Sequence, residues 1–210
     1  MRQMDKRTKS NIIKDAKATL ETAEFGLRDL INGPSNRKLS GLRNLVVFGR
    51  AVTNILQNLR STVPQFEEWY KRYREEMESD PLLKYFYNLR SVILKEGVVQ
   101  TKVEVKLKRL EFPADLDRIG PPQSLRNISK SYSLAFNGFG NYYWEVEFHD
   151  GSKIKYYTDL PTDIGSASRY FPNPPKKHLG KKLYDNSIEK LSTLYIEYLR
   201  KMVLEAEKSL

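Results

Sequence analysis

The stretch DPLLKYFYNLRSVILKEGVVQTKVEVKLKRLEF, residues 80–112, contains the change of hydrophobic period that decides the fold. Asp80-Pro81 begins a helix whose apolar residues recur every three to four positions, and Gly97 ends it. From Val99 to Phe112 apolar and charged residues alternate, which is the pattern of a strand with one wet face. The sequence therefore predicts a helical part that stops near Gly97 and a β part that follows.

Three more amphipathic helices precede this stretch. Their apolar residues share one face over residues 10–31, over residues 40–60, and after Thr62-Val63-Pro64. Short links join the four helices, which favours an up-and-down bundle. Residues 185–210 are helical again by the same criterion, and we expect this last helix to pack on the bundle.

The β part continues to about residue 158. Asn137-Gly138 and Asp150-Gly151 are hairpin turns between alternating segments, so residues 98–158 predict a three- or four-stranded antiparallel sheet. Residues 159–182 are rich in Pro, Gly, Ser and Lys and have no period, which indicates a long surface loop.

The predicted fold class is α+β and mostly α. It is an up-and-down bundle of four or five helices with an inserted three- or four-stranded antiparallel β-sheet. We expect one domain over residues 1–210, because a chain of this length suits a single core. Its parts are the bundle (1–97), the β-insertion (98–158), the loop (159–182) and the C-terminal helix (183–210).

The composition excludes several classes of site. With no cysteine, the chain has no disulfide, no thiolate nucleophile and no cysteine zinc site, and with two histidines it has little for a hydrolase triad. It has no P-loop, nucleophile elbow, HExxH motif or dinucleotide-binding turn. We predict no metal and no cofactor, we identify no catalytic residue, and we expect binding without catalysis.

Charge and hydropathy indicate where the protein acts. No apolar run approaches the roughly 18 residues of a membrane helix, and residues 1–9 are basic without the apolar core of a secretory signal. We therefore expect a cytoplasmic protein with no membrane partner. The net charge of +10 favours an anionic partner, nucleic acid first and acidic protein second, although solubility alone also explains it.

The first candidate site residue is Arg90, which falls on the apolar face of the fourth helix. An unpaired guanidinium is costly to bury, so Arg90 should reach a carboxylate, border a polar pocket or face a second copy of the chain. A paired structural arginine and an anion-binding arginine fit the pattern about equally well.

A polar stripe on the second helix and a basic loop supply further candidates. Arg43, Arg50, Asn54 and Gln57 project within roughly 60° of one another, and arginine and amide groups in a row suit phosphate and base contacts. Lys176, Lys177 and His178 form a basic loop that could contact phosphates. A solvated surface is the alternative for each group.

Residues 85–97, YFYNLRSVILKEG, resemble the final core helix of the HEPN superfamily. Active members of this superfamily join an arginine and a histidine from two protomers and cleave RNA without metal, in toxin–antitoxin and other prokaryotic defence systems. Arg90 matches the arginine and Ser91 the polar position, but Lys95 stands where histidine is expected. Lysine, with an ordinary pKa near 10.4, is a poor general base at pH 7, so the resemblance implies retained RNA binding without catalysis.

Three functional hypotheses follow. The first is a non-catalytic homodimer that binds RNA or another nucleotide anion through Arg90, Lys95, Arg43 and Arg50, in a defence or toxin–antitoxin context. The second is a weak metal-independent ribonuclease of the same superfamily. The third is a regulatory subunit whose basic surface or sheet edge binds a protein partner.

Overall fold

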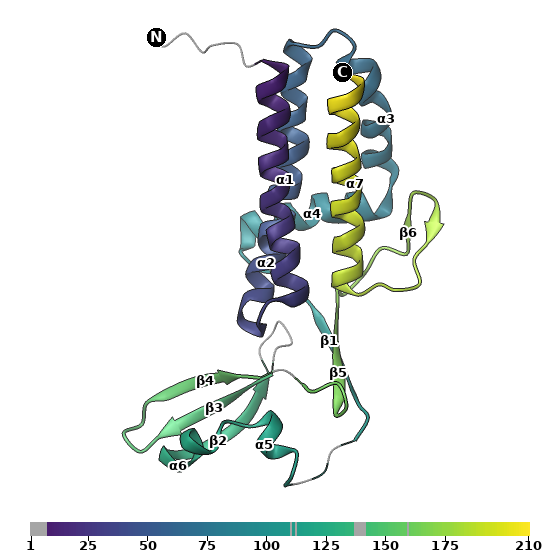
Figure 1. Ribbon diagram of the computed structural model, residues 1–210. Helices are drawn as coiled ribbons and strands as arrows, with labels where there is room; N and C mark the ends of the chain where they lie inside the picture. Colours follow the sequence, from purple (N-terminus) through teal and green to yellow (C-terminus); the bar gives the residue numbers. More distant parts are fainter. Residues whose placement is uncertain (1–7, 110, 112, 137–141, 159) are drawn as a thin grey trace, which may run out of the picture.

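The computed structural model describes residues 8–109, 111, 113–136, 142–158 and 160–210 of the chain. A long body of helices stands on one side and a smaller lobe of strands and short helices on the other, joined by a two-stranded ribbon (Figure 1). The fold class is α+β and mostly α, as predicted.

The helical body combines both ends of the chain. It consists of α1 (Lys9–Asn32), α2 (Ser35–Leu56), the 3₁₀ turn η1 (Gln57–Ser61), α3 (Phe66–Ser79), α4 (Pro81–Glu96) and the C-terminal α7 (Ile188–Ser209). In Figure 1, α1, α2, α3 and α7 run roughly alongside one another, whereas α4 crosses behind them. The 22 residues of α7 therefore complete a hydrophobic core to which the helices of the first hundred residues also contribute.

Local sequence explains the ends of these helices. The side chain of Thr8 accepts a hydrogen bond from the Asn11 amide at the start of α1, and Asp80 does the same for Leu83 in α4. Gly97 ends α4 in the left-handed conformation, with φ at 68°. The second helix begins at Ser35, five residues earlier than its apolar pattern predicts, directly after Pro34.

Two glycines bring α1 and α2 into close contact. A Cβ placed on Gly26 would lie 2.6 Å from the Gly41 carbonyl oxygen and 2.6 Å from the Leu45 amide nitrogen. A Cβ on Gly41 would lie 2.7 Å from the Gly26 carbonyl oxygen. The two backbones can approach this closely only because neither position has a side chain.

The lobe holds a three-stranded antiparallel sheet in the order β2 (Ser129–Phe136), β3 (Tyr142–Phe148) and β4 (Lys153–Tyr157). Two short helices, α5 (Leu116–Ile119) and α6 (Gln123–Ile128), accompany it. The Trp144 indole donates a 2.7 Å hydrogen bond to the Ile119 carbonyl, so α5 packs against the sheet. The predicted turn at Asn137-Gly138 lies outside the described residues.

The first predicted strand does not join this sheet. It forms β1 (Lys102–Leu107), which pairs antiparallel with β5 (Gly165–Tyr170) to make the ribbon between body and lobe. Residues 159–182 are therefore not a plain loop as expected, since they contain β5 and the small hairpin of β6 (Lys177–His178) and β7 (Lys181–Lys182). The segment GSASRY has little intrinsic strand preference and is a strand because β1 supplies its partner.

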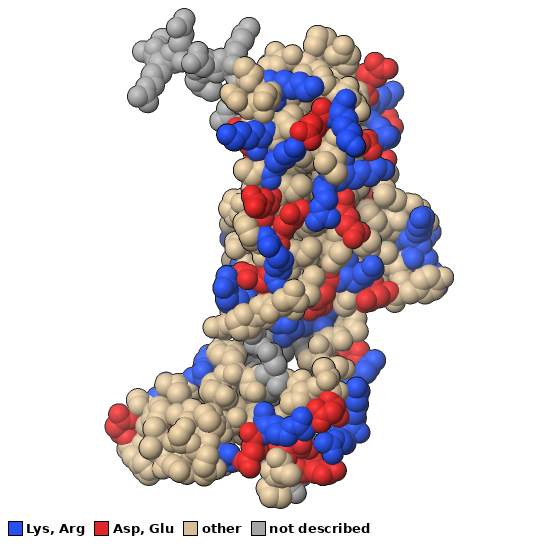
Figure 2. Space-filling view, viewed as in Figure 1, with Lys and Arg blue, Asp and Glu red and all other residues tan. Residues whose placement is uncertain are grey.

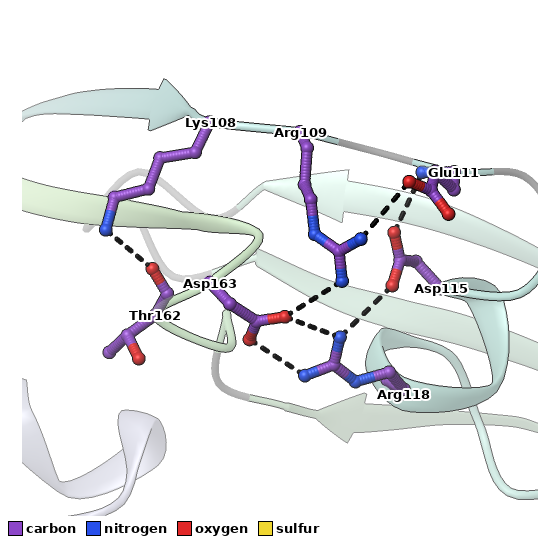
Figure 3. A network of polar contacts seen from close by, with 7 residues as sticks. All are labelled: Lys108, Arg109, Glu111, Asp115, Arg118, Thr162 and Asp163. Carbon is purple, nitrogen blue, oxygen red and sulfur yellow. Dashed lines mark hydrogen bonds and ion pairs between the residues drawn. The ribbon is translucent and has the colours of Figure 1, made fainter.

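Ion pairs join the two chain segments that enter the lobe beyond the ribbon (Figure 3). The Asp163 carboxylate accepts hydrogen bonds from both terminal nitrogens of Arg118, at 2.7 and 2.8 Å, and from Arg109 at 3.2 Å. The Arg118 hydrogen bonds hold the pKa of Asp163 well below its usual range. Arg118 also donates to the buried Asp115, which accepts from the Glu111 amide, so the cluster stabilises the entrance to the lobe.

Candidate nucleic-acid interface

Two contacts place the candidate residues of α2 beside those of α4. The Arg50 guanidinium lies over the ring of Tyr87, 5.2 Å from its centroid. The Arg43 side chain donates a hydrogen bond to the Gly97 carbonyl at the end of α4. Residues 43–50 of α2 therefore lie along residues 87–97 of α4. We call the surface that carries the following side chains the α2–α4 face: Arg43, Arg50, Asn54, Lys84, Tyr87 and Arg90.

Arg90 lies between these two contacts along α4 and is half-buried. Its Nε atom is buried and has no hydrogen-bond partner, and its guanidinium makes no hydrogen bond or ion pair with any residue that the structure describes. The carboxylate partner that would make Arg90 a paired structural residue is thus missing from the described residues. A half-buried cation without such a partner retains its capacity for an anion.

Asn54 is exposed on α2, on the same side of that helix as Arg50, whereas Lys95 is exposed on α4 and projects about 140° around the helix from Arg90. Neither forms an ion pair or a side-chain hydrogen bond within the described part of the chain. Lys95 lies in the last turn of α4, where a cation is favoured by the helix dipole. Four of the predicted residues, Arg43, Arg50, Asn54 and Arg90, therefore share one surface, and Lys95 is not placed on it.

A cleft of about 530 Å³ opens at one end of this face, between α2, η1, α3, α4 and α7. Cations and aromatic rings make up most of its polar lining. The lining residues are Arg50, Thr53, Gln57, Arg60, Tyr70, Arg74, Met77, Glu78, Leu83, Lys84, Tyr87, Asn88, Tyr195, Tyr198 and Leu199.

The inner wall of the cleft is aromatic and rigid. The ring of Tyr195 stacks on Phe86 at a centroid distance of 4.3 Å, and the Tyr198 hydroxyl donates a 3.0 Å hydrogen bond to Glu76. Burial raises the pKa of Tyr195 and of Tyr198 far above the ordinary value, so both phenols stay protonated. This wall is therefore uncharged, and the charge of the cleft comes from its rim.

The rim cations differ in their partners. Arg60 and Arg74 share the carboxylate of Glu67, and the hydrogen bonds from the two arginines lower the pKa of Glu67. Arg50 donates only to the Thr53 hydroxyl, and neither Arg50 nor Lys84 pairs with a carboxylate among the described residues. Arg50 and Lys84 are accordingly the rim cations best placed to receive an anion.

His178, which was predicted to contact phosphate from the basic loop, instead contacts a buried carboxylate. His178 turns inward, with a side chain 10% exposed, and its Nδ1 lies 3.1 Å from the buried carboxylate of Asp80. The Leu179 amide donates to the same carboxylate at 2.6 Å. His178 thus docks the β6–β7 hairpin on the start of α4 and is not available for phosphate, whereas Lys176 and Lys177 remain exposed.

The environment of Asp80 favours its charged form. Burial raises the pKa of this carboxyl, but hydrogen bonds from His178, from the Leu179 amide and from the Leu83 amide outweigh burial and lower the pKa below its ordinary value. Asp80 therefore caps α4 as an anion and stabilises the hairpin at the same time.

Sequence reasoning missed Arg60, Arg74, Lys84 and Tyr87, but a signal for this face was present. Residues 30–66 contain no Asp or Glu, and neither do residues 81–95. These two stretches supply α2, η1 and nearly all of α4, while α1, α3 and α7 each carry several carboxylates. The basic residues in the two stretches are Arg37, Lys38, Arg43, Arg50, Arg60, Lys84, Arg90 and Lys95.

Basic and acidic side chains are mixed over α1 and α7, in contrast to the α2–α4 face. In Figure 2, blue and red side chains alternate along this side of the body. Lys17 pairs with Glu207 at 2.6 Å and Arg200 with Glu24 at 2.7 Å. Lys17 and Arg200 on this side are thus neutralised by neighbours, whereas residues 30–66 and 81–95 contain no carboxylate that could do the same within the α2–α4 face.

The described residues contain no cluster of three or more His, Asp or Glu with the arrangement of a metal site. Among the same residues, none of the helices has the length and apolar character that crossing a bilayer requires.

Comparison with known proteins corrects the family interpretation. A family model described as bacteriophage lambda protein ea47 matches residues 38–126, which is less than half of the chain, and that description states no activity. No HEPN model matches, so the resemblance of residues 85–97 to that superfamily is wrong. Neither the curated proteins nor the solved structures contain a match to the chain.

The matched segment includes α3, α4 and almost all of α2, and with them every residue of the α2–α4 face. A short arginine-centred pattern on an amphipathic helix misled the sequence comparison, because such a pattern arises readily by chance. The expected defence context and the ribonuclease alternative rested on that resemblance and lose their support with it.

Proposed function

We propose that the protein binds RNA or another nucleotide anion through the α2–α4 face, without catalysis. The observation that carries this proposal is the absence of carboxylates from residues 30–66 and 81–95, which form the face. A basic surface without internal neutralisation is the electrostatic footprint of a polyanion-binding protein.

The energetic reason lies in the partners of the cations. A basic side chain already paired with a carboxylate must give up that pair to bind phosphate, as Lys17 and Arg200 would have to do on the other side of the body. Arg50 and Arg90 have no such pair among the described residues. Binding to them releases counterions from the nucleic acid without breaking an existing ion pair.

Salt dependence tests the proposal. Binding of labelled single-stranded RNA, single-stranded DNA and duplex DNA is measured by fluorescence anisotropy between about 50 and 200 mM salt. We expect RNA binding that weakens steeply with salt, and a logarithmic slope that Arg50→Ala makes shallower by about 0.7 if Arg50 neutralises one phosphate of a single strand.

Arg28→Ala is the matched control. Arg28 is exposed on α1 and lies over the half-exposed ring of Phe25 at 4.2 Å, so this variant also removes one arginine from an arginine–aromatic pair. Its effect should be small, because α1 lies outside the proposed face. Absence of RNA binding at low salt, or equal losses from Arg28→Ala and Arg50→Ala, would refute the proposal.

A protein partner is the second candidate function, and the lobe is the observation that favours it. Leu134 and Ile154 are 47% and 41% exposed on the two outer strands of the three-stranded sheet. Outer strands and exposed apolar side chains suit pairing with another chain. Affinity purification followed by size-exclusion chromatography should then give a stable hetero-complex that Leu134→Lys disrupts; recovery of the chain alone counts against this function.

Self-association is a related proposal. Leu94 and Val98, near the end of α4, are 54% and 49% exposed beside the face. Sedimentation equilibrium should show a homodimer that Leu94→Glu dissociates. A monomer at all concentrations up to about 100 μM would exclude it.

A further inference from the structure

The cleft differs from the rest of the α2–α4 face in its shape and its lining. Along the helices the face presents separate cations, whereas at the cleft the surface is hollowed to about 530 Å³. This volume lies within the range of small-molecule sites, roughly 300–1,000 Å³. A phosphate alone leaves most of such a space empty, so the cleft fits a larger group attached to the phosphate.

Tyr87 offers that group a flat surface. Its side chain is 53% exposed, the largest exposure among the aromatic residues of the cleft. The Arg50 guanidinium lies over this ring, 5.2 Å from its centroid, so a planar delocalised cation and an aromatic ring adjoin. Nucleobases stack on tyrosine rings and on arginine planes alike.

The rest of the lining suits a nucleobase. Leu83 and the buried ring of Tyr195 give an apolar floor, and the stacking of Tyr195 on Phe86 holds that floor in place. Asn88 and Glu78 are exposed at the edge and supply amide and carboxylate groups that can hydrogen-bond to a base edge. A nucleobase is a planar ring with polar atoms along its edge, so its shape and polarity match the apolar floor and polar rim of the cleft.

We propose that the cleft binds one nucleobase of the bound strand, stacked on Tyr87, while Arg50 and Lys84 contact the phosphate of the same nucleotide. This inference rests on the proposed function and deepens it. Such a site makes the protein selective for unpaired nucleotides, because a base inside a duplex cannot enter the cleft. The remaining cations of the face, Arg43 and Arg90, contact backbone phosphates of neighbouring nucleotides.

A comparison of two strands tests the inference. One is a labelled ten-residue oligouridylate, and the other is an abasic strand with the same number of phosphates and no bases. We expect Tyr87→Leu to weaken binding of oligouridylate by about 5- to 150-fold, the usual range for one base stacked on an aromatic residue, and to leave binding of the abasic strand unchanged.

Two controls keep the result interpretable. Tyr87→Phe retains the ring and should bind oligouridylate like the parent protein. Tyr184→Leu removes another exposed tyrosine beneath a cation, since Tyr184 is 88% exposed with the Lys182 ammonium 5.3 Å from its ring centroid, and should have no effect.

The outcomes separate this inference from the proposed function. If the two strands bind equally and Tyr87→Leu changes neither, the base site is refuted while salt-dependent, Arg50-dependent binding still supports the face. If Tyr87→Leu weakens both strands alike, Tyr87 acts only by positioning Arg50, and the base site is again refuted. If neither strand binds at low salt, both proposals fail.

Discussion

The contact of α1 with α2 allows a prediction in which two known effects have opposite signs. Replacing a glycine inside a helix by alanine ordinarily stabilises a protein by about 0.5–1 kcal/mol, because alanine loses less backbone entropy on folding. At Gly26 the added methyl carbon would lie 2.6 Å from two backbone atoms of α2. Ordinary contacts begin near 3.4 Å, so the helices must separate by about 0.8 Å.

The packing effect should prevail. Overpacking of a core typically costs about 1–3 kcal/mol, and backbone atoms on the far side of the contact place Gly26 at the upper end of that range. After subtraction of the helix preference, we expect Gly26→Ala to lower the free energy of unfolding by about 2 kcal/mol. For a chain of this size the melting temperature should fall by about 4–8 °C.

Urea denaturation followed by circular dichroism measures the effect. Ala18→Gly, at an exposed position of the same helix, calibrates the helix preference alone and should cost about 1 kcal/mol. Because Gly26 and Gly41 form one contact, Gly26→Ala combined with Gly41→Ala should cost less than the sum of the single variants. A Gly26→Ala protein more stable than its parent would refute the close contact.

Three further predictions concern the site and its support. Asp80→Ala should lower the free energy of unfolding by about 2–3 kcal/mol, through loss of the α4 cap and of the contacts to the hairpin. Since the folded-state pKa of Asp80 is lowered, its charge stabilises the protein at neutral pH, and this stabilisation is lost as the pH falls below about 4. The stability difference between parent and Asp80→Asn should therefore shrink with falling pH, and a difference that does not change with pH contradicts this. Gly49→Ala, whose Cβ would lie 2.7 Å from the Tyr195 ring, should destabilise the protein by about 1–3 kcal/mol and weaken RNA binding, whereas a gain in stability by urea denaturation would show that the ring yields. Arg90→Met should leave stability unchanged or raise it by about 1 kcal/mol while weakening RNA binding, and a loss of both would indicate a structural role.

The helical half of the fold could be predicted from the sequence because its signals are local. Apolar periodicity, Asp80-Pro81 and Gly97 act within a few residues, and α4 follows them as expected. The ribbon could not be predicted in the same way. β5 carries few strand-forming residues, and its partner β1 lies about sixty residues earlier in the chain, so only tertiary pairing makes it a strand.

The candidate site, too, could be predicted only where its signals are local. Arg43, Arg50 and Arg90 could be identified on single helices, since their positions on the wheel depend on sequence spacing alone. The cleft could not be predicted, because Arg60, Tyr70 and Lys84 come from three different elements. The role of His178 depends on Asp80, a residue 98 positions away, and no spacing rule connects the two.

The ribbon of β1 and β5 makes the lobe a detachable module. The chain leaves the helical body through Lys102–Leu107 and returns through Gly165–Tyr170, with Leu107 opposite Gly165 at the far end. A two-residue turn grafted between these positions would replace the whole lobe by a simple hairpin. The shortened chain keeps every helix of the body, so insertion and deletion at this point can exchange one accessory lobe for another without remodelling the core.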